Sequence, residues 1–213
     1  MNARIALAGM ALGLGACTSL TSTLPATAPV VSFVGAPTAA VPLAGVDAEL
    51  LRLQGELERR VARRDWGVPL QLSRGAEPWL RLRLGADESF ESGSAQLQPA
   101  VLLLYAEVGT VLRDAPAVTH VLVHGDAPEA DAATGITARR AASVQSYLLT
   151  QRVPGTRLRA EGRGAREPVT VEPGAAAANR RVELVIKPVI AGREAEAWLP
   201  PPAGGCGDCQ PHG

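Results

Sequence analysis

The spacing of apolar side chains between residues 68 and 187 changes repeatedly, and this constrains the fold more than any other feature of the chain. Over residues 68–84 apolar and polar side chains alternate on both sides of a turn at Ser73–Gly75, which is typical of two strands. The expected elements are strands over 68–72 and 80–84, a helix over 94–113, a strand over 117–123, a helix over 135–151, and strands over 156–161 and 180–187. With the first two strands counted as one hairpin, this order predicts an α+β domain, β-α-β-α-β-β, with helices packed on one face of a mixed sheet.

A further helix is expected before the sheet, from Asp47 to about Arg64, within a segment over residues 47–66. Asp47 is a suitable N-cap because its carboxylate can accept hydrogen bonds from the backbone N–H groups of the first turn. The apolar residues that share one face are Leu50, Leu53, Leu57 and Val61. A coiled coil needs about three or more heptads, so we expect this short helix to pack on the domain rather than to dimerise.

Residues 1–16 have the pattern of a bacterial export signal. Arg4 supplies a positive charge, and the apolar run over 5–14 would rise about 15 Å as a helix, roughly half the hydrocarbon thickness of a bilayer. The run ends in the letters L-G-A-C at residues 14–17, which resemble the lipobox of bacterial lipoproteins. That resemblance implies cleavage before Cys17, a diacylglyceryl group on its thiol and a further acyl chain, such as palmitate, on its amine. A cleaved secretory signal with an unrelated cysteine is the alternative.

The resemblance to lipoproteins also implies a location. One acyl chain holds a protein to a membrane only marginally, whereas two or more hold it firmly. Thr18 rather than Asp follows the cysteine, which in such lipoproteins implies sorting to the outer membrane, with the lipid-anchored chain facing the periplasm. Residues 17–46 are expected to be the lipidated cysteine and a flexible tether, because 18–46 contain four prolines and no charged side chain. Fully extended, the tether would reach at most about 100 Å.

Charge and motif content argue against several functions. Lys and Arg together number 21, as do Asp and Glu, so no net field attracts nucleic acid. The chain has no G-x-S-x-G motif, no P-loop and no pair of acids at a defined spacing. We therefore expect no enzyme, no cofactor and no metal site.

Residues 191–213 are expected to form a disordered tail that contains a C-x-x-C pattern at Cys206 and Cys209. With Cys17 acylated, these are the only two thiols, and a short local disulfide is their expected fate in an oxidising periplasm. A catalytic C-x-x-C normally opens a helix in a thioredoxin-like unit, which the pattern does not predict here. Adding His212 would give three scattered ligands on a tail, which is poor support for a metal site.

Four motifs resemble those of the OmpA-like peptidoglycan-binding domain. They are F-E-S-G-S-A-Q-L-Q-P at 90–99, I-T-A-R-R-A-A-S-V at 136–144, E-G-R-G with E-P-V within 161–169, and N-R-R-V-E-L at 179–184. Each motif is weak alone, but four in order at the family's spacing are specific. The resemblance implies an OmpA-like domain over 67–190 that binds peptidoglycan noncovalently and anchors the envelope to the cell wall.

In this family an Asp pairs with the ammonium group of the meso-diaminopimelate stem residue, and two Arg residues bind its carboxylate. Carried over by motif, the resemblance implies Asp126, Arg140 and Arg180 in these roles, and it adds Asn179 and Thr134 to the expected peptidoglycan-binding residues. A zwitterion needs an anionic acceptor and a planar set of donors at a fixed separation, and these residue types supply both.

The spacing of apolar residues supports the two arginines independently. Arg140 falls within the apolar sector of the helix over 135–151, whereas Arg139 points away from it. Arg180 has the same parity as Val182 in the last strand, so we expect it on the core side at the mouth of the strand, with Arg181 facing the other way. Two such arginines at one rim predict an anion site.

The loop after the third expected strand departs from the family, because V-H-G-D stands at residues 123–126 where the family has G-H-T-D. His124 keeps the family's histidine position, so we expect it to pack in the turn rather than to bind a metal. Asp126 either faces the ligand or is a solvated loop carboxylate. Arg140 either binds ligand or forms an internal ion pair with Asp126 or Glu161. The alternative function is a degenerate domain that acts as a protein-interaction scaffold in an envelope assembly.

Overall fold

The computed structural model describes residues 40–126, 135–171 and 176–201. The chain divides into two units, Met1–Phe33 and Val34–Gly213, and every described residue belongs to the second unit. Of the residues expected to bind peptidoglycan, carry the lipid or form a disulfide, Cys17, Thr134, Cys206 and Cys209 lie outside the described residues. None of the helices that the structure describes is both long enough and apolar enough to cross a membrane.

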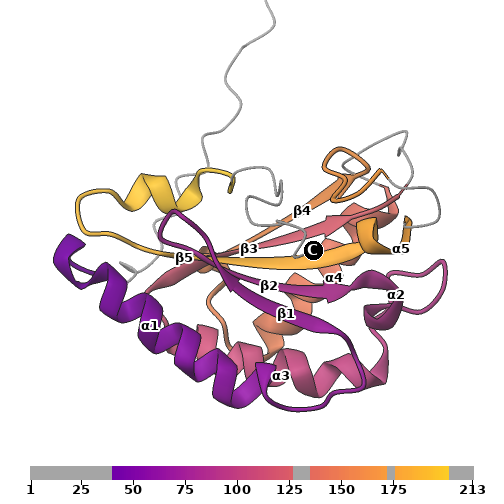
Figure 1. The fold of residues 1–213 in the computed structure, drawn as a ribbon, viewed down its shortest axis with the longest axis horizontal. Coiled ribbons are helices and arrows are strands. Elements are labelled where there is room, and N and C mark those ends of the chain that lie inside the picture. Colours follow the sequence, from indigo (N-terminus) through magenta and orange to yellow (C-terminus); the bar gives the residue numbers. More distant parts are fainter. Residues whose placement is uncertain (1–39, 127–134, 172–175, 202–213) are drawn as a thin grey trace, which may run out of the picture. The chain divides into compact units, whose positions relative to one another are not determined.

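The described residues form one five-stranded sheet (Figure 1). Its strands are β1 (Leu70–Arg74), β2 (Leu80–Gly85), β3 (Ala117–His124), β4 (Leu158–Gly164) and β5 (Arg181–Pro188), in the spatial order β1-β2-β5-β3-β4. Neighbouring strands are antiparallel except β3 and β4, which are parallel, so the sheet is mixed as predicted. Because β5 lies between β2 and β3, its first residue, Arg181, pairs with Gly85 and with His124.

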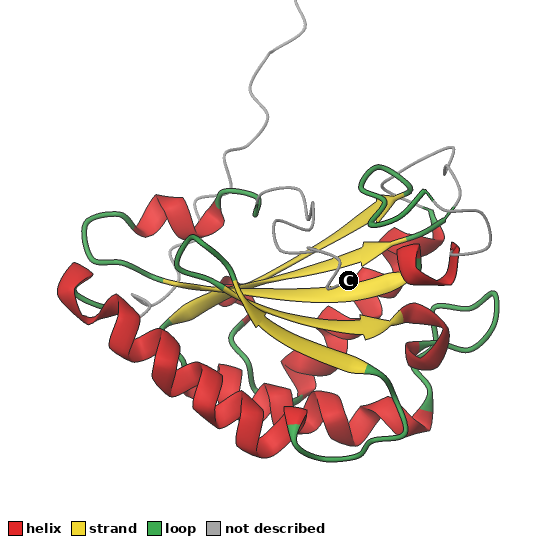
Figure 2. Cartoon of the chain, in the orientation of Figure 1, coloured by secondary structure: helices red, strands yellow, loops and turns green. Residues whose placement is uncertain are grey.

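Three longer helices lie on one side of the sheet (Figure 2). They are α1 (Val46–Leu57), which continues through a π-helical turn at Glu58–Ala62, α3 (Pro99–Asp114) and α4 (Ile136–Thr150). Two short helices, α2 (Ala86–Ser89) and α5 (Ala176–Asn179), adjoin the end of β2 and the start of β5. The helix expected from residue 94 begins at Pro99, because proline fits the first turn, where its missing N–H needs no partner.

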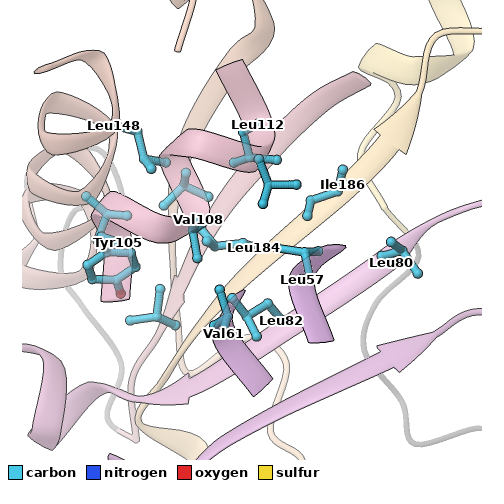
Figure 3. Packing of buried hydrophobic residues seen from close by; sticks show 14 of the residues in the cluster. Leu57, Val61, Leu80, Leu82, Tyr105, Val108, Leu112, Leu148, Leu184 and Ile186 are labelled. Carbon is cyan, nitrogen blue, oxygen red and sulfur yellow. The ribbon is translucent and has the colours of Figure 1, made fainter. Parts of the chain in front are cut away.

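The hydrophobic core lies between these helices and one face of the sheet. Figure 3 shows apolar side chains from three parts of the chain in contact: Leu57 and Val61, Val108 and Leu112 of α3, and Leu148 of α4, together with Leu82, Leu184 and Ile186 of the sheet. Full burial of such a side chain contributes about 1.5–3 kcal/mol. In β2 the leucines at 80, 82 and 84 face this core, so the arginines between them face the other side of the sheet.

A C-terminal segment covers part of that other side. A 3-10 helix over Glu194–Trp198 places Ala197 against Val118 and Val189, and the carbonyl of Ala197 accepts a hydrogen bond of 2.8 Å from Nε2 of His120. The tail was expected from residue 191, whereas the described domain continues to residue 201. A single 3-10 turn has too few residues to produce a periodic apolar pattern, so the sequence gives no signal for it.

Candidate functional site

Three charged residues meet at one edge of the sheet. Asp87 lies in α2, just after β2, Asp126 follows β3, and Arg180 immediately precedes β5. Because β5 runs antiparallel between β2 and β3, the beginning of β5 lies beside the ends of both neighbours. The topology thereby joins residues that are 54 and 93 positions apart in the sequence.

The guanidinium of Arg180 binds both carboxylates. Its Nε donates to Oδ1 and Oδ2 of Asp87 at 2.9 and 3.0 Å, and its Nη2 donates to Oδ2 of Asp87 at 2.6 Å. Its Nη1 donates to Oδ2 of Asp126 at 2.5 Å. Asp87 therefore occupies the side edge of the guanidinium, formed by Nε and Nη2, and Asp126 binds at the opposite nitrogen.

Arg140 of α4 adds a second guanidinium to the same cluster. Its Nε donates to the carbonyl oxygen of Ser94 at 2.8 Å, and its guanidinium carbon lies 4.9 Å from the centre of the Phe90 ring. Both partners belong to the segment F-E-S-G-S, which connects α2 to α3. A hydrogen bond and a cation–π contact fix the orientation of Arg140. The four charged residues Asp87, Asp126, Arg140 and Arg180 form the rim cluster, and the site that they make is the rim site.

The electrostatics of the cluster are mutually favourable. Hydrogen bonds from Arg180 hold the pKa of the Asp87 carboxyl below its usual value, and the charge of Arg140 acts in the same direction. Hydrogen bonds to Asp87 and Asp126 raise the pKa of Arg180. The side chains of Arg180 and Asp126 are 29% and 34% exposed and share a single hydrogen bond, so this ion pair contributes only about 0–1 kcal/mol. The contact between Arg180 and Asp126 can therefore be exchanged for contacts to a ligand at small cost.

Of the residues expected at the site, the structure places Asp126 and Arg180 in direct contact and Arg140 near Asp87. Asn179 has a different environment, because its amide is bonded to the backbone after β4. Its Oδ1 accepts from the N–H groups of Val169 and Thr170 at 2.9 and 3.2 Å, and its Nδ2 donates to the carbonyl of Thr170 at 2.9 Å. Asn179 thus fastens that segment to the start of β5, and its expected role in ligand binding stays a prediction.

Two details of the site differ from the expectations. Arg180 does lie at the mouth of β5, but the strand begins one residue later, at Arg181, and the Arg180 side chain is at the rim rather than on the core side. Asp87 was not among the expected residues. The signal that could have found it is its position directly after the strand that ends at Gly85, on the same edge as Asp126.

A second charged cluster is buried on the face of the sheet that the helices leave uncovered. Glu183 of β5 is 1% exposed and lies 2.7 Å from Nε of Arg181, 3.0 Å from Nη2 of Arg83 and 3.2 Å from Nε of Arg81. Burial raises the pKa of Glu183, but Arg81 and Arg181 outweigh it and hold the pKa below its usual value. Arg181 does face away from the core, as predicted, yet it is only 2% exposed. The cluster ties β2 to β5 beside the rim site.

His124 lies on this same face, buried between two carboxylates. Its Nδ1 is 4.0 Å from Glu167 and its Nε2 is 3.9 Å from Glu183, and neither nitrogen makes a hydrogen bond within the part of the chain that the structure describes. Burial lowers the pKa of His124 to about 3, so the ring is neutral at pH 7. The described residues include no group of three or more His, Cys, Asp or Glu side chains that could hold a metal ion.

The chain is similar to known proteins over the part that forms this site. Residues 89–181 match the model of the OmpA family. The probable lipoprotein YiaD of Escherichia coli (strain K12) is 33% identical over 112 residues, which is 51% of this chain and 51% of YiaD. The chain thus spans about half the length of this curated relative.

Two solved structures share the fold. A putative MotB-like protein from Desulfovibrio vulgaris superposes with a TM-score of 0.56 at 21% identity, covering 68% of this chain and 95% of that one. The cell wall anchor of the T6SS from Pseudomonas aeruginosa gives a TM-score of 0.51 at 23% identity, covering 65% and 96%. The mixed sheet with helices on one face and the four motifs in order agree with the match of residues 89–181 to the model of the OmpA family.

Proposed function

We propose that this chain is an outer-membrane lipoprotein whose periplasmic domain binds peptidoglycan noncovalently through meso-diaminopimelate. The observation that carries the proposal is the rim cluster, in which Asp126 and Arg180 touch and Arg140 acts on the same group of charges. An amino-acid end of the stem peptide presents an ammonium and a carboxylate. The ammonium would bind Asp126, and the carboxylate would bind the guanidinium groups of Arg140 and Arg180.

The energetics of the cluster suit such an exchange. A ligand must open the contact between Asp126 and Arg180, which is partly exposed and therefore worth only about 0–1 kcal/mol. The new contacts are charge-assisted hydrogen bonds, each of which contributes about 1.5–3 kcal/mol. Support also comes from the relatives, since the Escherichia coli protein is described as a probable lipoprotein and the Pseudomonas aeruginosa structure as a cell wall anchor.

A pull-down with purified peptidoglycan sacculi tests the proposal. We expect the full-length protein in detergent to be retained and to be released by free meso-diaminopimelate. Arg140→Ala and Arg180→Ala should each weaken retention at least tenfold, or about 1.4 kcal/mol. Arg139→Ala is the matched control, because Arg139 is exposed on the same helix and should leave retention unchanged. Equal retention of all three variants would contradict the assigned site.

One observation favours a second candidate function. Arg180 already has two internal carboxylate partners, and a domain that keeps this arrangement would be a protein-interaction scaffold in an envelope assembly rather than a wall binder. The same pull-down separates the two, because a scaffold would not be retained on protein-free sacculi. We expect no enzymatic activity in either case, and release of soluble muropeptides during the incubation would contradict this.

A further inference from the structure

Asp87 holds Arg180 more extensively than any other residue that the structure describes. Three hydrogen bonds of 2.6–3.0 Å join its carboxylate to Nε and Nη2 of Arg180. A guanidinium presents its five N–H donors in one plane, and a bidentate carboxylate fills one edge of that plane. With the side edge filled by Asp87, a ligand carboxylate can reach Arg180 only from the end where Asp126 now binds Nη1.

We propose that Asp87 makes the rim site selective for ligands that carry an ammonium group beside their carboxylate. This inference rests on the proposed function and deepens it. A zwitterionic ligand can replace the contact between Asp126 and Arg180 without unpairing either residue, because its ammonium binds Asp126 while its carboxylate binds Arg180. A ligand carboxylate without an ammonium leaves Asp126 unpaired next to the incoming negative charge. Such a ligand cannot bind the other edge of Arg180 instead, because Asp87 occupies that edge.

The charge balance of the cluster supports the same conclusion. Two carboxylates, Asp87 and Asp126, stand beside two guanidinium groups, Arg140 and Arg180, so the four groups sum to no net charge. A neutral site prefers a neutral zwitterion over an anion. Neutralising Asp87 would leave the site with one excess positive charge and would free the side edge of Arg180 for a second mode of carboxylate binding. Both effects improve the binding of plain anions.

The test compares two competitors that differ only in their amines. The full-length protein in detergent is bound to sacculi and displaced with meso-diaminopimelate or with pimelate, which is the same dicarboxylate without its amino groups. For the unmodified protein we expect the concentration of pimelate needed for displacement to exceed that of meso-diaminopimelate by about tenfold or more. In Asp87→Asn this ratio of displacing concentrations should fall to about threefold or less. Glu88→Gln removes the same charge one residue away and should keep the original ratio.

Folding does not obscure the result, because the Asp87 side chain is half-exposed and thermal melting checks each variant. Asp87→Ala provides a second variant, in which the ratio should narrow in the same way. An unchanged ratio in both Asp87 variants, with the unmodified protein still retained and still displaced by meso-diaminopimelate, would overturn this inference and leave the proposed function standing. Failure of the unmodified protein to bind sacculi would overturn both.

Discussion

Replacing Glu183 with glutamine is expected to destabilise the domain strongly. Glu183 is almost completely buried, and three guanidinium groups lie within 3.2 Å of its carboxylate. The substitution keeps the size of the side chain but removes the only negative charge among these contacts. The buried arginines would then lose their nearest counter-charge, in surroundings where an uncompensated charge is costly.

The size of the destabilisation depends on which contacts each arginine keeps after Glu183 is replaced. Removing one partner of a buried ion pair costs about 3–5 kcal/mol. Arg83 is partly exposed and can turn toward water, and Arg181 keeps hydrogen bonds to the carbonyls of Asn179 and Glu167 at 3.3 and 3.0 Å. Arg81 keeps least, because Glu183 is its ion-pair partner and its Nε has no hydrogen bond among the described residues. We therefore expect the lower end of the range, about 3 kcal/mol.

Urea denaturation followed by circular dichroism measures this loss. With a urea slope of about 2 kcal/mol per molar, a change of about 3 kcal/mol lowers the midpoint by about 1.5 M. Glu161→Gln is the matched control, because Glu161 lies on β4 in more exposed pairs with Arg163 and Arg166 and should cost about 1 kcal/mol or less. A loss of under about 1 kcal/mol for Glu183→Gln would refute the view that this cluster holds β2 and β5 together.

Three further predictions concern pH, packing and the anchor. His124 is neutral in the folded protein, where its pKa is about 3 against an unfolded value of 6.5. Its contribution to the free energy of unfolding is therefore complete above pH 6.5 and is lost as the pH falls toward 3, because only the unfolded chain gains the proton in that range. Between pH 7 and pH 5 the unmodified protein should lose about 2 kcal/mol more stability than His124→Gln in urea titrations, and parallel curves would contradict the assignment. Gly162→Ala would place a Cβ 2.3 Å from the backbone nitrogen of Ala138, and we expect this clash to lower the free energy of unfolding by about 1–3 kcal/mol. The thermal midpoint should fall accordingly, whereas an unchanged midpoint would show that α4 can shift freely. Cys17→Ser should release the protein from the membrane fraction into the soluble periplasm, and membrane retention would refute the lipid anchor.

The order of strands and helices could be predicted from the sequence because local periodicity determines it. The leucines at 80, 82 and 84 alternate with arginines, and the structure places them in the core as the period of two requires. The long helices follow their apolar stripes in the same way. The pairing of Asp126 with Arg180 was accessible only through the resemblance, because it depends on β5 inserting between β2 and β3.

The remaining features depend on contacts between distant segments. Alternation predicts which way Arg181 faces, but only the tertiary structure determines whether that face meets water or other protein atoms. Arg181 lies between Gly85 of β2 and His124 of β3, so its burial depends on strands that are far apart in the sequence and that no local pattern reports. Asp87 was missed for the same reason, since a carboxylate in a single helical turn is ordinary in a sequence until its partner 93 residues away is known.

A structure of the full-length protein bound to meso-diaminopimelate tests most directly whether one rim binds both charged groups of an amino acid. We predict that the ligand's ammonium nitrogen lies about 3 Å from the carboxylate of Asp126, and that its carboxylate oxygens lie at similar distances from the guanidinium groups of Arg140 and Arg180. A ligand bound elsewhere, with Asp126 and Arg180 still joined to each other, would contradict the account.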